Sequence, residues 1–239
     1  MSATAPFADL GLVVAAAGSG SRYSLARSKL FEPLGGEPLF LRSLRVFAAV
    51  IPTERMVLVV NEAVQERFRQ ALRALPDGLR ITVVAGADTR AGSVCRGLEA
   101  LPTELSLVAV QDAARPLSSV DLLCRCVAAA RQYGSGVAAR HVTDTIKLAD
   151  AAGCVIATPD RAALWAAETP QVFRLADLKR AYAEALRSGR DPTDEASAIE
   201  ALGLPVHLVE SLLPNPKVTH RTDAAIVRLL LDQDPTPEA

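Results

Sequence analysis

Aromatic side chains make up only 4% of this 239-residue sequence, and neither sign of charge dominates, with 26 Lys and Arg against 27 Asp and Glu. Proteins that bind single-stranded nucleic acid stack bases on aromatic faces, and most nucleic-acid-binding domains carry an excess of basic residues. We therefore expect no nucleic-acid partner. The balanced charge also excludes an acidic disordered chain, so any anion must be bound by a few placed cations rather than by a global field.

Cysteines and long apolar runs are scarce as well. The four cysteines form no CxxC pair and the three histidines lie far apart, so we expect neither a disulfide framework nor a structural zinc site. The longest apolar run covers residues 12–17, whereas a membrane-spanning helix needs ~20 apolar residues. The N-terminus has no signal-peptide pattern. These absences predict a cytoplasmic protein with reduced thiols and no membrane partner.

What the sequence does contain is a regular alternation of apolar strands and amphipathic helices. We expect strands at residues 12–17, 56–60, 81–85, 105–110, 136–139, 171–173 and 206–209. We expect helices at residues 39–50, 62–74, 93–101, 120–133, 176–188, 194–202 and 222–231. Because the strands are apolar on both faces, this pattern indicates an α/β fold with a doubly wound, mostly parallel sheet and helices on both of its sides.

The alternation is interrupted after residue 141. Two short β-like segments at 145–148 and 154–158, with a turn near 150–153, predict an inserted hairpin arm at about 142–160. An apolar insertion needs a surface on which to pack, and a second copy of the chain would supply one, so we expect a homodimer. No linker or repeat divides the sequence, which predicts a single domain over 1–239 with a frayed, Pro-rich tail at 233–239.

A glycine-containing loop, AAAGSGSRYSLARSK, follows the first expected strand. Gly18 and Gly20 let backbone N–H groups approach an anion, and Arg22 and Lys29 add positive charge beside them. The dinucleotide-binding fingerprint is not matched, because Tyr23 stands where its third glycine belongs, and the P-loop spacing is absent. The alternatives are a bland surface loop and a phosphate-binding loop of another kind, and the density of cations favours the second.

Three further segments carry polar residues at places where an α/β sheet binds ligands. Asp112 and Arg115, in QDAARP, directly follow the strand at 105–110, where a carboxylate can hold the Mg²⁺ of a nucleotide. A helix-capping Asp with a surface Arg explains this motif equally well. In GADTR, Asp88 or Thr89 is expected to cap the next helix, at a place where a nucleobase or ribose would be met. Lys217 taken alone is an ordinary surface lysine.

Seven motifs nevertheless occur together in a characteristic order. They are AAAGSGSR with Ser28-Lys29, GADTR followed by Ser93-Val94, QDAARP, Asp144-Thr145-Ile146-Lys147, Thr169-Pro170-Gln171, Thr193-Asp194-Glu195-Ala196-Ser197 and Lys217-Val218-Thr219. In this order the sequence resembles the 2-C-methyl-D-erythritol 4-phosphate cytidylyltransferase family over residues 12–231. Other nucleotidyltransferases share single motifs, whereas the ordered set is specific.

The resemblance implies a nucleotidyltransferase fold, a homodimer joined by the arm, and transfer of CMP from CTP to 2-C-methyl-D-erythritol 4-phosphate, with pyrophosphate as the second product. The residues that it implies for CTP are the backbone of Ala16, Ala17, Gly18 and Gly20, the cytidine-side Asp88 and Ser93, and the phosphate-binding cations Arg22, Lys29 and Lys217. The residues that it implies for the sugar phosphate are Arg115, Thr145, Arg161 and Thr169, with Thr145 and Arg161 supplied by the arm of the partner. Asp112 is matched to the residue beside the magnesium ion.

This reaction explains why the motifs contain cations but no His or Cys nucleophile. A phosphomonoester has a second pKa near ~6, so at neutral pH it is already an oxyanion and needs no general base. Catalysis must instead bring two polyanions together and offset charge as pyrophosphate leaves. The departures from the family pattern are Ser28, Leu30, Gln111 and Gly92, and none of them removes a charge. Two alternatives remain, a cytidylyltransferase for ribitol 5-phosphate or another polyol phosphate, and a non-catalytic nucleotide-binding regulatory domain.

Overall fold

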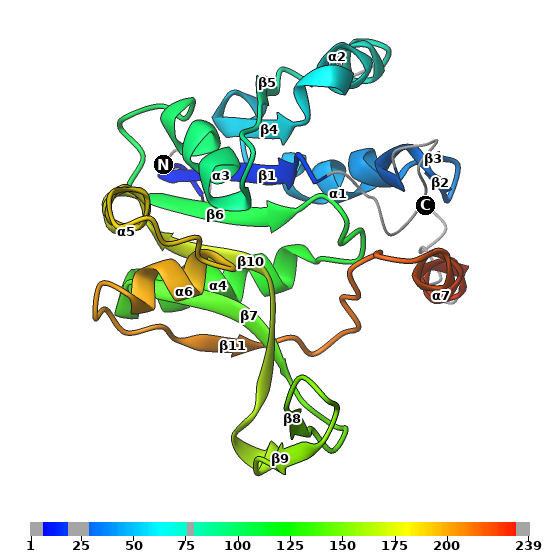
Figure 1. The fold of residues 1–239 in the computed structure, drawn as a ribbon. Coiled ribbons are helices and arrows are strands. Elements are labelled where there is room, and N and C mark those ends of the chain that lie inside the picture. The colour runs from blue at the N-terminus through cyan, green and yellow to red at the C-terminus, as the bar shows by residue number, and fades with distance from the viewer. Residues whose placement is uncertain (1–6, 19–28, 76–78, 233–239) are drawn as a thin grey trace.

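The computed structural model describes residues 7–18, 29–75 and 79–232. Its main feature is a seven-stranded sheet in the order β11-β7-β10-β6-β1-β4-β5 (Figure 1). The strands are β1 (Leu10–Ala16), β4 (Met56–Val60), β5 (Thr82–Ala85), β6 (Leu107–Asp112), β7 (Ser135–His141), β10 (Trp165–Arg174) and β11 (Leu208–Glu210). Every neighbouring pair is parallel except the two pairs that contain β10. The predicted α/β fold with a mostly parallel sheet is confirmed.

Strand β10 is the main difference from the prediction. The sequence predicts a strand only at 171–173, but β10 has ten residues and pairs antiparallel with both β6 and β7. Its first half includes Glu168 and Thr169, which interrupt any apolar run, and the register shifts between Ala167 and Gln171. Two short strands, β2 (Pro33–Leu34) and β3 (Glu37–Pro38), were also not expected, since pairs of residues leave no periodicity to detect.

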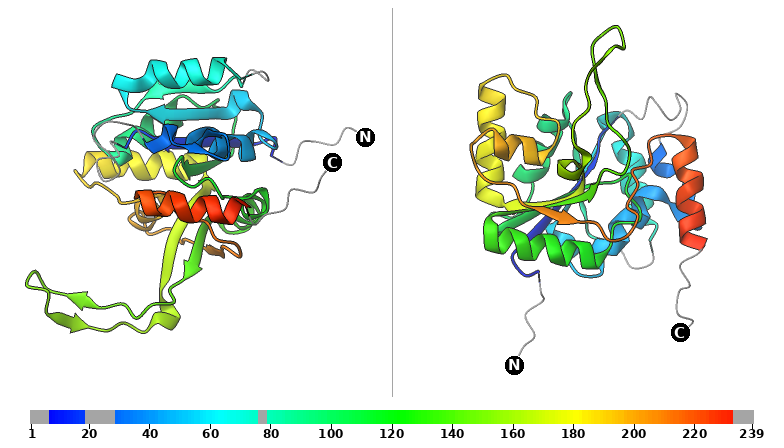
Figure 2. Two further views of the ribbon diagram at one scale, coloured as in Figure 1. Left: turned by 90° about the vertical axis from the view of Figure 1, so that its right-hand side faces the viewer. Right: turned by 90° about the horizontal axis from the view of Figure 1, so that it is seen from below.

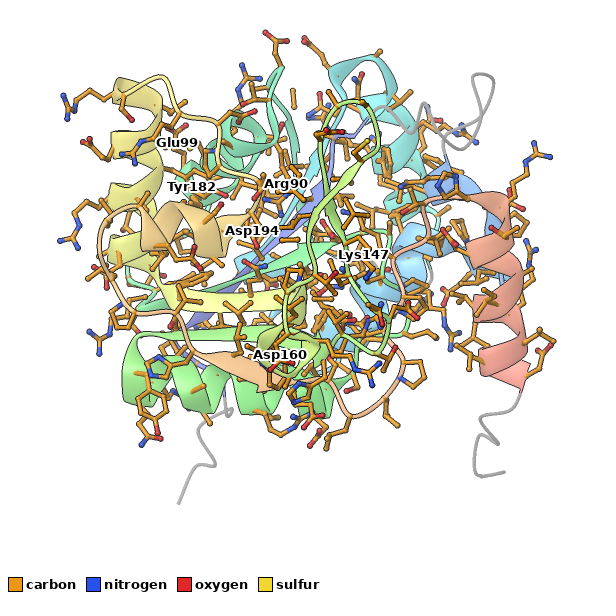
Figure 3. All side chains as sticks on the ribbon, turned by 60° about the horizontal axis from the view of Figure 1, so that its bottom comes forward. Arg90, Glu99, Lys147, Asp160, Tyr182 and Asp194 are labelled. Carbon is orange, nitrogen blue, oxygen red and sulfur yellow. The ribbon has the colours of Figure 1, made fainter. Side chains whose placement is uncertain are left out.

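The expected arm lies between β7 and β10. It contains β8 (Leu148–Ala149) and β9 (Val155–Ala157), and it extends away from the sheet (Figure 2). The predicted turn is confirmed, because Asp150 Oδ1 accepts from two backbone N–H groups of the turn at 2.9 Å and Gly153 has a φ of 84°. The first arm strand was predicted at 145–148 and lies at 148–149, and the second was predicted at 154–158 and lies at 155–157. Lys147 and Asp160 mark the arm in Figure 3.

Apolar side chains of the arm remain uncovered within the described chain. Leu148, Val155 and Ile156 are 52%, 60% and 69% exposed. Burial of apolar surface contributes about 25 cal/mol per Å². Covering these three exposed side chains would therefore contribute favourable free energy that the described chain alone does not gain. The arm therefore carries an exposed apolar patch, a feature that is common at interaction surfaces.

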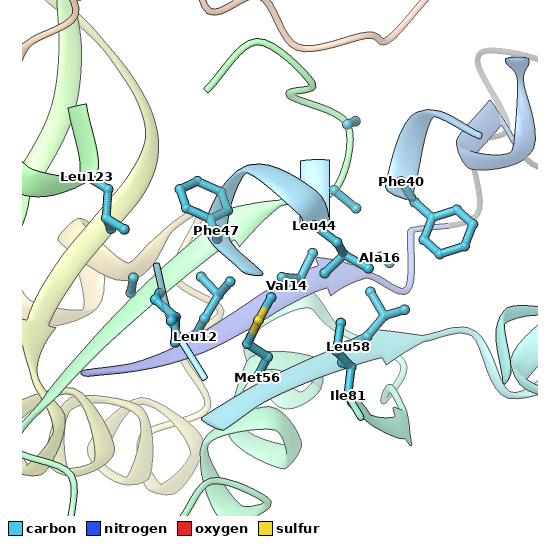
Figure 4. Close-up of a cluster of buried hydrophobic side chains, with 14 of the residues drawn as sticks. Leu12, Val14, Ala16, Phe40, Leu44, Phe47, Met56, Leu58, Ile81 and Leu123 are labelled. Atoms are coloured by element: carbon cyan, nitrogen blue, oxygen red, sulfur yellow. The ribbon is translucent and has the colours of Figure 1, made fainter. Parts of the chain in front are cut away.

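Helices cover both faces of the sheet and create two apolar layers. One layer holds α1 (Leu39–Ala48), α2 (Gln65–Arg73), α4 (Val120–Tyr133) and α7 (Arg221–Asp232), and the other holds α3 (Arg90–Glu99), α5 (Leu175–Arg187) and α6 (Glu195–Glu200). Successive side chains of a strand point to opposite faces. Leu12 and Val14 accordingly enter the first layer, shown in Figure 4, while Val13 enters the second. A fully apolar β1 is needed because both of its faces are covered.

Capping residues in the sequence determine where a helix begins and ends. The helix predicted at 120–133 begins after Ser119, whose side chain accepts from the N–H of Leu122, and ends at Gly134 with a left-handed φ of 92°. Within it Cys124 is exposed and Cys126 is buried, as two positions on different helix faces should be. All four cysteines are free. No helix in the described ranges is both long and apolar enough to cross a bilayer.

Candidate active site

A cavity of about 510 Å³ lies at the carboxyl ends of the central parallel strands. Arrows β1, β4 and β6 point to the same side in Figure 1, so the loops that follow them meet there. The cavity is lined by Ala15, Ala16, Ala17, Gly18, Lys29, Leu30, Asn61, Ala87, Asp88, Thr89, Arg90, Ser93, Asp112, Ala114, Lys217 and Thr219. Most of the residues implied for CTP are therefore gathered at one place. Gly20 and Arg22 lie outside the described residues, as does the tail at 233–239.

The loop between β5 and α3 forms one wall of the cavity. Thr89 is the N-cap of α3, since its Oγ1 accepts from the N–H of Gly92 at 3.0 Å. Ser93 is only 5% exposed, and its hydroxyl accepts from the N–H of Ala87 at 2.9 Å and lies 2.9 Å from the carbonyl of Thr89, to which it donates. Ser93 thus fixes the loop, while Asp88 stays exposed beside the cavity.

Close backbone approach shapes the same wall. A Cβ added to Gly86 would lie 2.6 Å from Cβ of Ala17 and 2.8 Å from Oγ of Ser93. A side chain at this position would push the loop after β5 away from the loop after β1. A Cβ on Gly92 would likewise lie 2.9 Å from the Cβ of Ala87. Glycine at position 92, one of the departures from the family pattern, therefore allows this loop to fold tightly.

Asp112, at the end of β6, is surrounded by cations. Its Oδ2 lies 2.8 Å from Lys217 Nζ and 3.6 Å from Arg115 Nε, and its Oδ1 lies 3.9 Å from a terminal nitrogen of Arg90. Burial alone would raise the pKa of Asp112, but the charges of Lys217, Arg90 and Arg115 outweigh it and hold the pKa below its usual value. The carboxylate is therefore ionised at neutral pH.

Arg90 is a site residue that the sequence reasoning missed. Its guanidinium donates two hydrogen bonds to the fully buried carboxylate of Glu195, at 2.6 and 3.0 Å, and Tyr182 donates a third to the same group at 2.8 Å. Burial lowers the pKa of Arg90, yet Glu195 and Asp112 outweigh this and raise it. Figure 3 labels Arg90 and Tyr182 together with Asp194, the residue that precedes Glu195. The motifs that contain Arg90 and Glu195 were both noted in the sequence, but nothing in the sequence indicates that these two residues, 105 positions apart, form a pair.

Lys29 joins the start of the chain to its end. Its Nζ donates to the carbonyl of Val218 at 2.9 Å, and the N–H of Val218 donates to the carbonyl of Ala114 at 2.8 Å. Lys29 begins a short 3₁₀ helix, η1 (Lys29–Phe31). Three segments from distant parts of the sequence are thereby tied together around the cavity, and Lys29 and Lys217 both reach it.

Two residues implied for the sugar phosphate lie behind Asp112 instead of lining the cavity. Thr169 is 3% exposed, and its Oγ1 accepts from the N–H of Asp112 at 3.0 Å. The side chain of Arg115 is 11% exposed and donates to the carbonyl of Asn215 at 2.6 Å. In this arrangement Thr169 positions Asp112, and direct contact of either residue with substrate stays a prediction.

The other two implied residues, Thr145 and Arg161, are on the arm. Both are exposed, and Arg161, in the 3₁₀ helix η4 (Arg161–Ala163), donates to the carbonyl of Thr143 at 2.9 Å. Neither lines the cavity of its own chain. The structure of one chain thus brings together the described residues implied for CTP and leaves these two apart.

The fit of a magnesium ion rests on Asp112. No group of three or more acidic, His or Cys side chains suited to a metal occurs in the part of the chain that the structure describes. Mg²⁺ does not require one, because it usually takes one or two carboxylates and completes its shell with water and substrate phosphates. An ionised Asp112 beside a cavity that Lys29, Arg90 and Lys217 also line fits this mode. The neighbouring Gln111 is fully buried and donates to Ser118 Oγ at 2.8 Å, so this departure from the family pattern secures the loop that follows Asp112.

Comparison with known proteins agrees with this geometry. The family model described as 2-C-methyl-D-erythritol 4-phosphate cytidylyltransferase matches residues 10–233. A protein of that name from Bacillus velezensis is 39% identical over 92% of this chain and 94% of its own, and one from Geobacillus kaustophilus is 40% identical over 92% and 95%. The crystal structure of the enzyme from Thermus thermophilus has a TM-score of 0.77 at 30% identity and covers 94% of this chain and 99% of its own. The chain therefore belongs to the 2-C-methyl-D-erythritol 4-phosphate cytidylyltransferase family.

Proposed function

We propose that this protein transfers the cytidylyl group of CTP to 2-C-methyl-D-erythritol 4-phosphate, giving 4-diphosphocytidyl-2-C-methyl-D-erythritol and pyrophosphate for isoprenoid precursor synthesis. One observation carries the proposal. Lys29, Arg90 and Lys217 line a single cavity at the carboxyl ends of parallel strands, together with the ionised carboxylate of Asp112. A site whose described lining gathers cations without a His or Cys side chain suits the joining of two phosphate groups.

The chemistry assigns the following roles to the chain. A phosphate oxygen of the sugar phosphate attacks the α-phosphorus of CTP, and the bond from that phosphorus to the bridging oxygen of the β-phosphate breaks. The attacking group is already ionised, so no residue needs to remove a proton. Lys29 and Lys217 hold the phosphates in line and offset the charge that grows on the leaving pyrophosphate. We propose the same phosphate-binding role for Arg22, and contact of the Gly20 backbone with CTP, on the resemblance to the family.

We propose Mg²⁺ as the cofactor, held by Asp112 together with phosphate oxygens of CTP. When bound, such an ion neutralises phosphate charge and orients the leaving group. The contribution of the protein is to keep Asp112 ionised through Lys217 and the two neighbouring arginines. Activity should therefore disappear with a chelator and return when Mg²⁺ is added, and full activity in the presence of excess chelator would refute this part.

We propose that the protein acts as a homodimer in which each arm reaches the site of the partner. The exposed apolar arm and the separation of Thr145 and Arg161 from the cavity support this. Deletion of residues 149–153 should reduce the mass measured by light scattering, and an unchanged dimer mass would count against the arm. Mixing Lys29→Met chains with Arg161→Ala chains should restore activity that neither variant has alone, because one of the two sites then receives both native residues.

We also propose a cytoplasmic location and a single domain over 1–239. All four thiols are free, which is usual in a reducing compartment. Seven strands, from β1 near the start of the sequence to β11 near its end, belong to one sheet, which supports a single folding unit. A single cooperative unfolding transition by both calorimetry and circular dichroism would agree with one domain, whereas two separate transitions would contradict it.

Pyrophosphate release tests the reaction. The assay takes CTP and Mg²⁺ with 2-C-methyl-D-erythritol 4-phosphate, with ribitol 5-phosphate, or with no acceptor. We expect release only with the first acceptor. Release with ribitol 5-phosphate alone would replace the proposed substrate, and no release with any polyol phosphate, despite binding of CTP, would favour a regulatory domain.

A further inference from the structure

Glu168 is a buried carboxylate outside the set of residues implied for catalysis. Its side chain is 4% exposed and lies where the register of β10 shifts, between Ala167 and Gln171. A buried charge is costly unless it is both paired and hydrogen-bonded. The partners of Glu168 therefore indicate what keeps it there.

Both oxygens of Glu168 are engaged. Oε1 lies 3.3 Å from Arg140 Nε and 3.9 Å from a terminal nitrogen of Arg115. Oε2 accepts from Ser211 Oγ at 2.8 Å and from Asn215 Nδ2 at 3.2 Å. These partners come from three separate parts of the chain: β7, the loop after β6, and the segment that follows β11.

Two of these partners lead directly to the candidate active site. Arg115 stands between two carboxylates. Its Nε is 3.6 Å from Asp112 Oδ2, while the terminal nitrogen that donates to the carbonyl of Asn215 at 2.6 Å lies 3.9 Å from Glu168 Oε1. This Nε is buried and makes no hydrogen bond to any described group. Arg115 is thus held just short of a hydrogen bond to Asp112. Asn215, two residues before Lys217, is itself 4% exposed and fixed by Glu168.

We propose that Glu168 is a positioning residue that keeps Arg115 from closing onto Asp112 and fixes the segment 211–217, which carries Lys217. The proposal rests on the proposed function. Without the charge of Glu168, Arg115 loses one of its two carboxylate neighbours and is drawn to the other. A charge-assisted bond between Arg115 and Asp112 then withdraws Arg115 from the sugar phosphate and Asp112 from the proposed Mg²⁺.

A double-mutant cycle separates this role from general support of the fold. Glu168→Gln keeps the size of the side chain and removes its charge, and Arg115→Met removes the group through which Glu168 acts. We expect Glu168→Gln to lower kcat/KM for the sugar phosphate by about tenfold in the native background and by less than about twofold in the Arg115→Met background. An equal loss in both backgrounds would overturn the proposal.

Arg140→Gln is the matched control. It removes a partner of the same Glu168 oxygen, but Arg140 is 59% exposed and is not among the described residues that line the cavity. Exposed ion pairs contribute little, so we expect kcat/KM within about twofold of the native value. A tenfold loss in this variant would show that any partner of Glu168 matters equally and would contradict a specific action through Arg115.

Hydrogen exchange tests the second half of the proposal without any substrate. In Glu168→Gln the amides of residues 211–217 should exchange faster by about tenfold, because the side-chain bonds from Ser211 and Asn215 are weakened. The amides of α3 should be unchanged. Unaltered exchange in 211–217 would overturn the proposal even if the enzyme is active. If native protein released no pyrophosphate, the proposed function would fail separately, and the exchange result would still decide whether Glu168 fixes this segment.

Discussion

Replacement of Lys29 by methionine separates two contributions of one side chain. Methionine keeps an unbranched stem of similar length but carries neither the charge nor the N–H donors. In the structure Lys29 Nζ donates to the carbonyl of Val218, and its charge also helps to lower the pKa of Asp223. In the proposed reaction the same ammonium offsets charge on the phosphates. The variant should therefore lose some stability and much more activity.

The two magnitudes differ enough to be told apart. A hydrogen bond from a charged donor contributes about 1.5–3 kcal/mol, and the partly buried position of Lys29 favours the lower end. For a protein of this size about 1.5 kcal/mol lowers the midpoint of thermal unfolding by roughly 3–6 °C. Loss of one preorganised group that stabilises developing charge costs about 10²–10³ in kcat. The protein should thus stay folded at 25 °C and turn over at least a hundredfold more slowly.

The assay is pyrophosphate release at saturating CTP and sugar phosphate, alongside thermal unfolding. Lys179→Met, on α5 and away from the cavity lining, is the control and should match the native kcat within about twofold. Lys29→Arg should recover part of the activity because the charge is kept. A Lys29→Met enzyme with the expected fall in midpoint but a native kcat would refute the electrostatic role and leave Lys29 as a tether only.

Three further predictions concern other parts of the structure. Gly86→Ala should cost about 1–3 kcal/mol of stability and raise the KM for CTP, since its Cβ would lie 2.6 Å from that of Ala17; a native KM would contradict this. Partial burial raises the pKa of Asp223, but two N–H donors at the start of α7 outweigh it and lower the pKa. This stabilisation is present above the unfolded pKa of about 4 and is lost as pH falls through the lower folded value, so Asp223→Asn should flatten the loss of unfolding free energy in acid titrations. Burial raises the pKa of Cys126 to about 12, so a thiol reagent at pH 8 should modify the two exposed cysteines first and reach Cys126 only on unfolding.

Much of the sheet followed from local chemistry. Residues 56–60 form β4 with the predicted bounds, because a five-residue run of buried apolar side chains suits a strand covered on both faces. The helix at 120–133 was predicted equally accurately, with Ser119 as its start signal and Gly134 as its stop signal. Strand β10 was underestimated because its polar residues, Glu168 and Thr169, face inward contacts that only the neighbouring strands and loops provide.

Some residues of the candidate site were likewise identified from the sequence, and others only from the structure. Lys29 and Asp112 were recognised because each lies in a motif whose residue types suit phosphates or a metal ion, whereas Lys217 was assigned only through the resemblance to the family. Arg90 was overlooked even though its motif was noted, because its partner Glu195 lies 105 positions away. Thr169 was expected at the substrate, and the structure places it beneath Asp112, where it accepts a hydrogen bond from the backbone. Motifs thus identified residue types, while contacts distinguished those at the cavity from those that support it.

The sequence by itself determined the class of fold, the hairpin arm and the kind of chemistry, since alternation of apolar segments, turn residues and clustered cations are all local properties. Tertiary structure alone decided that β10 runs against its neighbours, that Lys29 meets the segment of Lys217, and that Glu168 lies between Arg115 and Asn215. These facts depend on distances between residues far apart in the chain. Whether a charged side chain binds a ligand or another side chain is settled by which oppositely charged groups the fold brings within a few ångströms of it.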